Sequence, residues 1–333
     1  MNGELEDKRI EFRVPVSPTP GFISQVRFYA CALRRLGGIY ERALISIIVG
    51  DHCDVEELRK QNEWSAGQNL RWIAVPDDIF DKYGVWGTAN WRLCMGAEGS
   101  DIIVLSDADS VIVGDISPAL QLVNSSDAAI AGHMANAPPV VQSSPIKDLR
   151  NGNHKKFWPA LYKAFGIPWG GDLHRYSLDK GRDFPEAPPY FNGGFVVFNR
   201  AALAHYQRET IWFEDAIKQF ADTYYRPQIG ITIIAAKNRI KAHSLPAQYN
   251  ATNDLLHYQL HKLTPDQLKV IHYLRCDEIN RSEIFLPEHL ESFLARELKN
   301  PVNQVVQSLA LQLKNSLSQN CFSDSVQISV PIA

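Results

Sequence analysis

The stretch Asp101-Ile-Ile-Val-Leu-Ser-Asp-Ala-Asp109 decides the fold, because it joins a short apolar run to two carboxylates. The β-branched run at 102–105 predicts a buried strand in a covered, mainly parallel sheet. Side chains two positions apart on an extended chain point the same way, so Asp107 and Asp109 can project together from the carboxyl end of this strand. Ligands bind at that end of open α/β sheets. The pair therefore predicts a site for Mg²⁺ or Mn²⁺ completed by substrate phosphates, although Asp-x-Asp also occurs in ordinary turns.

The composition indicates a globular protein with one large α/β domain or two smaller ones. The 333 residues carry a net charge of −3, so no basic field favours a nucleic-acid partner. The charged start of the chain lacks the apolar core of a signal peptide, and the longest apolar runs are too short for a transmembrane segment. The five scattered cysteines have no metal-binding spacing, and we expect most of them to be buried thiols. These features predict a cytoplasmic protein.

Strands and helices alternate along the first part of the chain, which implies a mainly parallel sheet with helices on both faces. The apolar patterns predict strands at 13–16, 43–49, 72–75, 102–105, 111–113 and 128–132, with helices at 22–36 and 87–96.

The second part of the chain begins with an irregular insertion at 133–189, rich in Pro, Gly and Asn, with one helical piece near 157–165. An insertion of this length commonly serves as a lid or substrate loop. Regular patterns return with an apolar strand at 195–198, a helix at 201–223, an apolar segment at 229–236 and a late strand at 270–273.

The tail at 287–320 predicts two amphipathic helices that are broken near Pro301. Their polar faces lack the basic residues of membrane-surface helices. We therefore expect the apolar stripes to pack on the core or on a second copy of the chain, in a homodimer.

Three further features can complete a ligand site beside the acidic pair. Arg92 lies in a segment that opens the helix before the apolar strand, where it could bind an anion or simply be solvated. Asn192 is followed by paired glycines, which indicate close approach of a ligand or an ordinary bulge. His272 lies near the end of a strand, where it could be a third metal ligand or a structural histidine.

The order of these pieces resembles the GT-A glycosyltransferases, and is most similar to the family 8 retaining enzymes, the group of glycogenin and bacterial galactosyltransferases. The pieces are Asp107-Ala-Asp109, Phe191-Asn-Gly-Gly194, Pro227-Gln228, Leu245-Pro-Ala-Gln-Tyr-Asn250 and Ile271-His-Tyr273. The resemblance implies a Rossmann-like α/β domain over residues 10–285, with a mixed, mainly parallel sheet flanked by helices. Residues 133–189 would be an acceptor loop and residues 286–320 a C-terminal helical tail.

The resemblance also implies a donor site. Asp107, Asp109 and His272 would hold Mn²⁺ (or Mg²⁺) on the diphosphate of a nucleotide-sugar, most simply a UDP-sugar, with Ala108 beside it. The metal would neutralise the leaving nucleoside diphosphate.

The remaining family positions concern the transferred sugar. Arg92 would lie near the donor sugar, and Asn192 and Gly193 would contact it. Gln228 matches the glutamine below the anomeric carbon, where it could support an oxocarbenium-like centre. Retention would follow from attack on the same face, without a protein nucleophile.

The chain departs from the family pattern at several positions. Pro227 and Ile229 replace the aspartates that flank the family's glutamine. Ser17 or a neighbour stands where the family has an acidic residue for the nucleotide base. Glu278 stands where the family has a diphosphate-binding lysine, so Arg275 or Arg281 is expected to supply that cation.

The acceptor of such an enzyme would be a carbohydrate or glycoside. The insertion offers four candidates for its pocket, namely Trp158, Trp169, Asp172 and His174. Aromatic faces suit sugars, but these side chains could equally pack the insertion itself.

Two other functions compete with glycosyl transfer. In a phosphatase of the haloacid dehalogenase type, Asp107 would be a nucleophile and Asp109 an acid or base. That fold usually begins with its motif, whereas here a long segment precedes it. A sugar- or nucleotide-binding relative without catalysis is the other alternative, because a fold alone does not establish activity.

Overall fold

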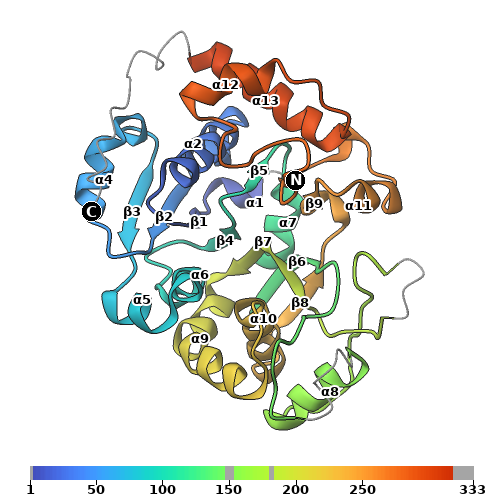
Figure 1. The fold of residues 1–333 in the computed structure, drawn as a ribbon. Helices are drawn as coiled ribbons and strands as arrows, with labels where there is room; N and C mark the ends of the chain where they lie inside the picture. Colours follow the sequence, from blue (N-terminus) through green and yellow to red (C-terminus); the bar gives the residue numbers. More distant parts are fainter. Residues whose placement is uncertain (1–2, 147–153, 180–183, 318–333) are drawn as a thin grey trace.

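The computed structural model describes residues 3–146, 154–179 and 184–317. A seven-stranded sheet with strand order β3-β2-β1-β4-β7-β6-β8 forms its centre (Figure 1). Neighbouring strands are parallel except β7, which is antiparallel to both β4 and β6. The predicted mixed, mainly parallel sheet is therefore confirmed. Its strands are β1 (Ile10–Val16), β2 (Leu44–Val49), β3 (Leu70–Ala74), β4 (Ile102–Ser106), β6 (Ala129–Met134), β7 (Phe191–Asn199) and β8 (Lys241–Ser244).

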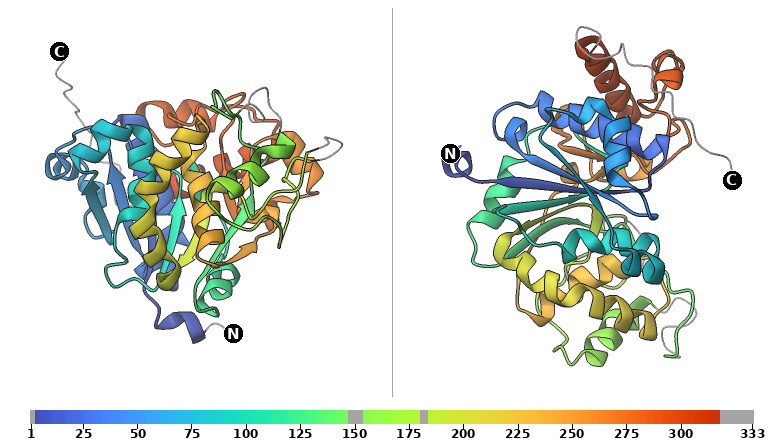
Figure 2. Two further views of the ribbon diagram at one scale, coloured as in Figure 1. Left: turned by 90° about the horizontal axis from the view of Figure 1, so that it is seen from below. Right: turned by 90° about the vertical axis from the view of Figure 1, so that its left-hand side faces the viewer.

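Helices cover both faces of this sheet, as Figure 2 shows. One side carries α2 (Pro20–Arg35) and α7 (Ser117–Asn124), with α12 (Pro287–Leu294) and α13 (Pro301–Leu317) outside α2. The opposite side carries α6 (Val85–Cys94), α8 (His154–Ala164), α9 (Arg200–Phe220) and α10 (Arg226–Lys237). The shorter helices are α1 (Gly3–Glu6), α3 (Ile39–Arg42), α4 (Val55–Gln61), α5 (Asp77–Tyr83) and α11 (Leu255–Leu260), with 3₁₀ turns at Glu63–Ser65, Ala247–Tyr249 and Pro265–Gln267.

Strand β4 explains why its sequence is apolar without interruption. Ile102 and Val104 pack in the core under α2, whereas Ile103 and Leu105 pack in the core under α6 and α9. All four side chains are fully buried. A strand covered on both faces has no solvent side and needs no polar alternation.

A second, three-stranded sheet joins distant parts of the chain. It consists of β5 (Ser110–Ile112), β10 (Val270–His272) and β9 (Ala251–Thr252), in the order β5-β10-β9. β5 and β10 are antiparallel, and their register places His272 opposite Ser110. This pairing brings the late strand directly beside the acidic pair that follows β4.

The predicted insertion and tail have different outcomes. Helix α8 confirms the helical piece expected in the insertion, whereas residues 147–153 and 180–183 lie outside the described part. The apolar stripes of α12 and α13 pack in one core with Phe28 and Ile271 of the same chain. Packing of the tail on the core is therefore confirmed, and the homodimer stays a prediction. Residues 318–320 lie outside the described part.

The prediction of buried thiols was wrong for the described cysteines. Cys31, Cys53 and Cys94 are half-buried, and Cys276 is exposed. Cys321 lies outside the described residues. Within the described ranges, every helix is too short or too polar to cross a membrane.

Candidate active site

A cavity of about 640 Å³ opens at the carboxyl edge of the central sheet, where ligands of open α/β sheets bind. The carboxyl ends of β1, β4 and β6 reach it, and antiparallel β7 begins at the same edge. The first turns of α6 and α10 also contribute. Its polar and charged lining consists of Ser17, Thr88, Arg92, Asp107, Asp109, Asn136, Asn192, Gln228, His272 and Arg281.

Hydrogen bonds fix the turn that carries the acidic pair at the floor of the cavity. Asp107 follows β4, and the backbone N–H of Ser110 donates to its carbonyl oxygen at 3.1 Å. Just after β10, the backbone N–H of Tyr273 donates to the carbonyl of Asp109 at 2.9 Å, and the Tyr273 hydroxyl donates to the carbonyl of Ala108 at 3.2 Å. The carboxylates thus project from a fixed backbone.

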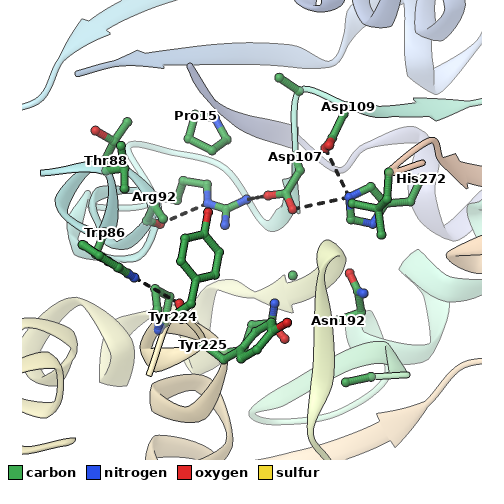
Figure 3. A pocket seen from close by; sticks show the side chains of 18 of the residues that line it. Pro15, Trp86, Thr88, Arg92, Asp107, Asp109, Asn192, Tyr224, Tyr225 and His272 are labelled. Atoms are coloured by element: carbon green, nitrogen blue, oxygen red, sulfur yellow. Dashed lines mark hydrogen bonds and ion pairs between the residues drawn. The ribbon is translucent and has the colours of Figure 1, made fainter. Parts of the chain in front are cut away.

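His272 meets both carboxylates, as Figure 3 shows. Its Nε2 atom lies 3.2 Å from Oδ1 of Asp109 and 3.7 Å from Oδ2 of Asp107. One ligand atom from each of the three residues lies within 4.8 Å of the others. The structure therefore brings together the three side chains for which the sequence predicts a metal.

Gly194 makes room for the imidazole of His272. A Cβ atom at this position would lie 2.2 Å from Nδ1 of His272, far closer than real contacts allow. At Gly193 a Cβ would lie 3.6 Å from the Gln228 side chain, an ordinary contact. The second glycine of the Asn-Gly-Gly motif is therefore needed for His272 and not for a turn.

The acidic pair attracts positive charge. Burial alone would raise the pKa of Asp109, but His272 and Arg281, which donates to this carboxylate, lower it below its ordinary value. Burial alone would lower the pKa of His272, but Asp109 and then Asp107 raise it. Two carboxylates and an imidazole are also a donor set that suits Mn²⁺ or Mg²⁺.

Arg92 reaches the acidic pair from a different part of its helix than predicted. Helix α6 begins at Val85, so Arg92 lies in its last turn and not at its opening. Its Nη1 atom lies 2.9 Å from Oδ1 of Asp107 and donates to the carbonyl of Ser106 at 3.2 Å. Trp86, Thr88 and neighbouring residues of the first turn line the cavity instead.

A buried arginine on β1 holds the end of that helix. Arg13 donates to the carbonyl oxygens of Arg92, Met95 and Gly96 at 2.6, 3.1 and 2.6 Å. Its charge is paired with the fully buried carboxylate of Glu11 at 2.9 Å. The sequence analysis missed this residue, although two opposite charges inside an apolar strand are a readable signal.

The other predicted donor-site residues divide into two groups. Ser17, Asn192, Gly193 and Gln228 line the cavity. Arg275 does not: its guanidinium pairs with Asp254 at 3.0 Å, and its side chain is 60% exposed. Of the two arginines expected to face a diphosphate, the structure places Arg281 in the cavity and Arg275 outside it.

Glu278, which stands at the family's lysine position, makes structural hydrogen bonds in this protein. Both carboxylate oxygens of Glu278 accept backbone N–H groups, from Lys299 and Asn300, and one also accepts the Asn303 amide. Glu278 therefore anchors its segment to the start of α13. Beside Gln228, Pro227 lines the cavity, whereas Ile229 is fully buried in the core.

The mouth of the cavity is aromatic, which the sequence analysis did not predict. Trp86, Tyr224 and Tyr225 line it, and 64% of the surface of Tyr224 is exposed. The indole N–H of Trp86 donates to the carbonyl of Tyr224 at 3.0 Å, and the guanidinium of Arg226 lies 4.4 Å from the centre of the indole ring. These contacts fix the position of Trp86 at the mouth.

The four acceptor-pocket candidates from the insertion do not line this cavity. Trp158 is buried and donates to the hydroxyl of Tyr176 at 2.8 Å. Trp169 packs edge-on against Tyr162, and His174 pairs with Asp172. Their prediction as pocket residues was wrong for this cavity, because they serve the internal contacts of the insertion.

Comparison with known proteins identifies the class of enzyme. Residues 92–233 match the sequence model of the Rhodobacterales glycosyltransferase domain. No curated protein matches the chain. The match spans α6 to α10, and it confirms the predicted class, a glycosyltransferase.

Solved structures similar to this chain are also glycosyltransferases. Mouse xyloside xylosyltransferase 1 has a TM-score of 0.48 and 13% identity, over 81% of this chain and 98% of that one. The bifunctional glycosyltransferase WbbM has a TM-score of 0.48 and 14% identity, over 81% of this chain and 46% of that one. GlyE of Streptococcus pneumoniae TIGR4 has a TM-score of 0.47 and 12% identity, over 97% of this chain and 66% of that one.

Proposed function

We propose that this glycosyltransferase is a metal-dependent enzyme of the GT-A type, resembling family 8, that transfers a sugar with retention from a UDP-sugar to a carbohydrate or glycoside acceptor. The observation that carries the proposal is the convergence of Asp107, Asp109 and His272 on the floor of a cavity large enough for a nucleotide-sugar. Residues 10–285 would form the catalytic domain.

Asp107, Asp109 and His272 would hold Mn²⁺ or Mg²⁺. When bound, such a metal neutralises the negative charge that develops on a leaving diphosphate. The fit rests on the donor set and on the pull of the two carboxylates for positive charge, which draws Arg281 to Asp109 and raises the pKa of His272. Arg92 would keep Asp107 oriented, through the contact of 2.9 Å.

Arg281 would turn from Asp109 to the phosphate oxygens once a divalent cation occupies the acidic pair. Its side chain lines the cavity and is partly exposed, so it has room to do so. A guanidinium pairs well with phosphate oxygens. Ser17 and its neighbours at the end of β1 would lie against the nucleotide base.

The sugar would lie between the start of β7 and the first turn of α10. Asn192 and Gly193 would contact it, and the amide of Gln228 would face the anomeric carbon. The acceptor would attack on the face from which the diphosphate leaves, without a protein nucleophile, and the sugar would keep its anomeric configuration. The aromatic mouth of Trp86, Tyr224 and Tyr225 would bind the acceptor sugar through its apolar face.

The phosphatase alternative fits the site less well. A nucleophilic aspartate needs a free carboxylate oxygen aimed at phosphorus. Here Arg92 and His272 both contact Asp107, and His272 and Arg281 both contact Asp109.

A thermal-shift screen of nucleotide-sugars with and without Mn²⁺ tests the proposal. A ligand that binds only the folded state raises the melting temperature by mass action. The true donor should do so only with metal. A screen in which no nucleotide-sugar shifts the melting temperature in either condition would contradict the proposal.

A substitution at the aromatic mouth tests where the acceptor binds. Tyr224→Ala should raise the acceptor KM about threefold to tenfold and leave the donor KM unchanged, with Trp169→Ala as the control.

A further inference from the structure

A second cluster of potential metal ligands lies outside the cavity. His133 lies near the end of β6, and His257 and His261 lie on α11 and at its end. One ring nitrogen from each of the three residues lies within 4.8 Å of the others. Residues four positions apart on a helix share one face, a spacing also used by pairs of metal-binding histidines. The cluster shares no residue with the acidic pair and its histidine.

The hydrogen bonds of two of these histidines fix where their lone pairs are. A carbonyl oxygen can only accept, so Nδ1 of His133 donates to Leu245 at 2.9 Å, and Nε2 carries the lone pair. In the same way Nε2 of His261 donates to Ser177 at 2.9 Å, and Nδ1 carries the lone pair. Metal-binding histidines usually donate their second N–H to a carbonyl or carboxylate in this manner.

His257 is fully buried and lacks a complete set of partners. Its Nε2 lies 3.4 Å from Nε2 of His133, and its Nδ1 is buried with no partner among the described residues. With the proton on Nδ1 of His257, the Nε2 lone pairs of His257 and His133 face each other and repel. A cation between these two atoms would attract both lone pairs. With the proton on Nε2, the two rings share a hydrogen bond, and Nδ1 stays unsatisfied. A bound metal removes the repulsion in the first arrangement, while Nδ1 lacks a partner among the described residues in both.

The surroundings favour neutral imidazoles. Burial lowers the pKa of His133 to about 4 and, with the two neighbouring histidines, that of His257 to about 3. Neutral imidazole is the form that binds metals. Three such ligands without a carboxylate suit zinc and similar transition metals, and do not suit Mg²⁺ or Ca²⁺.

The cluster also lies directly behind the cavity wall. Ala135 and Asn136, two and three residues after His133, line the cavity. Ser177, which accepts the N–H of His261 at its carbonyl, donates from its backbone to Ala135 at 3.0 Å and from its hydroxyl to Asn136 at 2.7 Å. The three histidines therefore connect α11, β6 and the insertion at the place where they form the wall.

We propose that His133, His257 and His261 form a second metal site, which takes Zn²⁺ or a similar divalent transition metal and braces the cavity wall. The site is structural: it holds the wall and takes no part in the transfer itself. The proposal is independent of the donor site, because it rests on other residues and another class of ligand.

Zinc content and melting temperature of the full chain, produced without a polyhistidine tag, test this proposal. The Asp109→Asn variant serves as the background, so that the acidic cluster in the cavity is weakened as a competing site. After removal of metal with a chelator, one equivalent of Zn²⁺ should bind and raise the melting temperature. In the same background His261→Gln should weaken zinc binding at least about tenfold, and His289→Gln, a histidine on α12 outside both clusters, should not.

The side chain of His261 is only half-buried, so its variant should fold even if His257→Gln does not. Cobalt offers a second readout, because four-coordinate Co²⁺ with three imidazole ligands absorbs visible light. We expect His261→Gln to remove these absorption bands. Equal zinc binding by the His261 and His289 variants, or no zinc binding by the Asp109→Asn protein, would overturn the proposal.

Discussion

The two clusters of potential metal ligands in this protein differ in charge, exposure and position. The acidic cluster, Asp107, Asp109 and His272, lines the cavity and already contacts two arginines. The histidine cluster, His133, His257 and His261, carries no carboxylate, has two fully or nearly fully buried members and lies behind the wall. Under our two proposals, the first cluster would exchange cationic partners and the second would keep one metal ion. Ligand type and access to solvent would then distinguish a metal used in chemistry from a metal that supports the structure.

Asp109→Asn should separate the two clusters most strongly. The variant removes a carboxylate charge from the acidic cluster, and metal assistance to a leaving diphosphate is worth several kcal/mol, so transfer should fall about a thousandfold or more. Zinc at the histidine cluster should be unaffected. Steady-state transfer and metal content measure the two effects, with Asp101→Asn at the other end of β4 as the control. Unchanged turnover would refute the role of the acidic cluster.

Gly194→Ala tests whether the acidic cluster depends on the space left by a missing side chain. The added methyl group would overlap the His272 ring, so the fold should lose about 1–3 kcal/mol and Mn²⁺ binding should weaken. Gly193→Ala is the matched control, because its methyl group makes only an ordinary contact. Urea unfolding and Mn²⁺ titration measure both. Equal effects of the two variants would show that the His272 contact does not matter.

Arg281→Ala should move metal and nucleotide binding in opposite directions. Without the guanidinium, Asp109 loses a competing cation, so Mn²⁺ alone should bind more tightly. The nucleoside diphosphate loses a charged hydrogen bond, so its affinity should fall about tenfold. Calorimetry with each ligand measures both changes. Arg275→Ala should change neither, and a loss of nucleotide affinity there would reverse our assignment of the two arginines.

Asn136→Ala changes the cavity wall between the two clusters and should have the smallest effect on kinetics of these variants. The change removes the hydrogen bond from the Ser177 hydroxyl, which is worth about 1 kcal/mol, so the acceptor KM should rise about fivefold. Ser177→Ala should have the same effect, and the double variant should add little to either single change. Full additivity in acceptor kinetics would mean that the contact does not hold the wall.

The sequence predicted the parts of the fold and site that depend on local pattern and chain order. The apolar run before Asp107 identified β4, and the order of short motifs brought Asn192, Gln228 and His272 into one hypothesis. Asn192 and Gln228 lie near the starts of β7 and α10, and His272 ends β10, so the order of elements in the two sheets brings them to one cavity.

The remaining features depend on tertiary contacts that no local pattern carries. Whether Arg275 or Arg281 faces the cavity is decided by Asp254, which takes the first as its partner. Trp158 is buried and Tyr224 exposed, although both are aromatic residues in loop-rich parts of the sequence. The histidine cluster forms only when α11 packs against β6, more than a hundred positions away in the chain.

Glu278 connects the C-terminal helices to the segment that carries Arg281. Arg281 lies in the segment from Leu274 to Leu286. In this segment, Glu278 accepts hydrogen bonds from the residues before α13, and the side chain of Gln25 in α2 donates to the backbone carbonyl of Arg281 at 3.1 Å. Arg281, which contacts Asp109, therefore lies in a segment that is held both by α2 and by the residues before α13. Under the proposed function, we expect that a change that loosens α13 would also loosen the hold on Arg281 and weaken the binding of the donor's diphosphate.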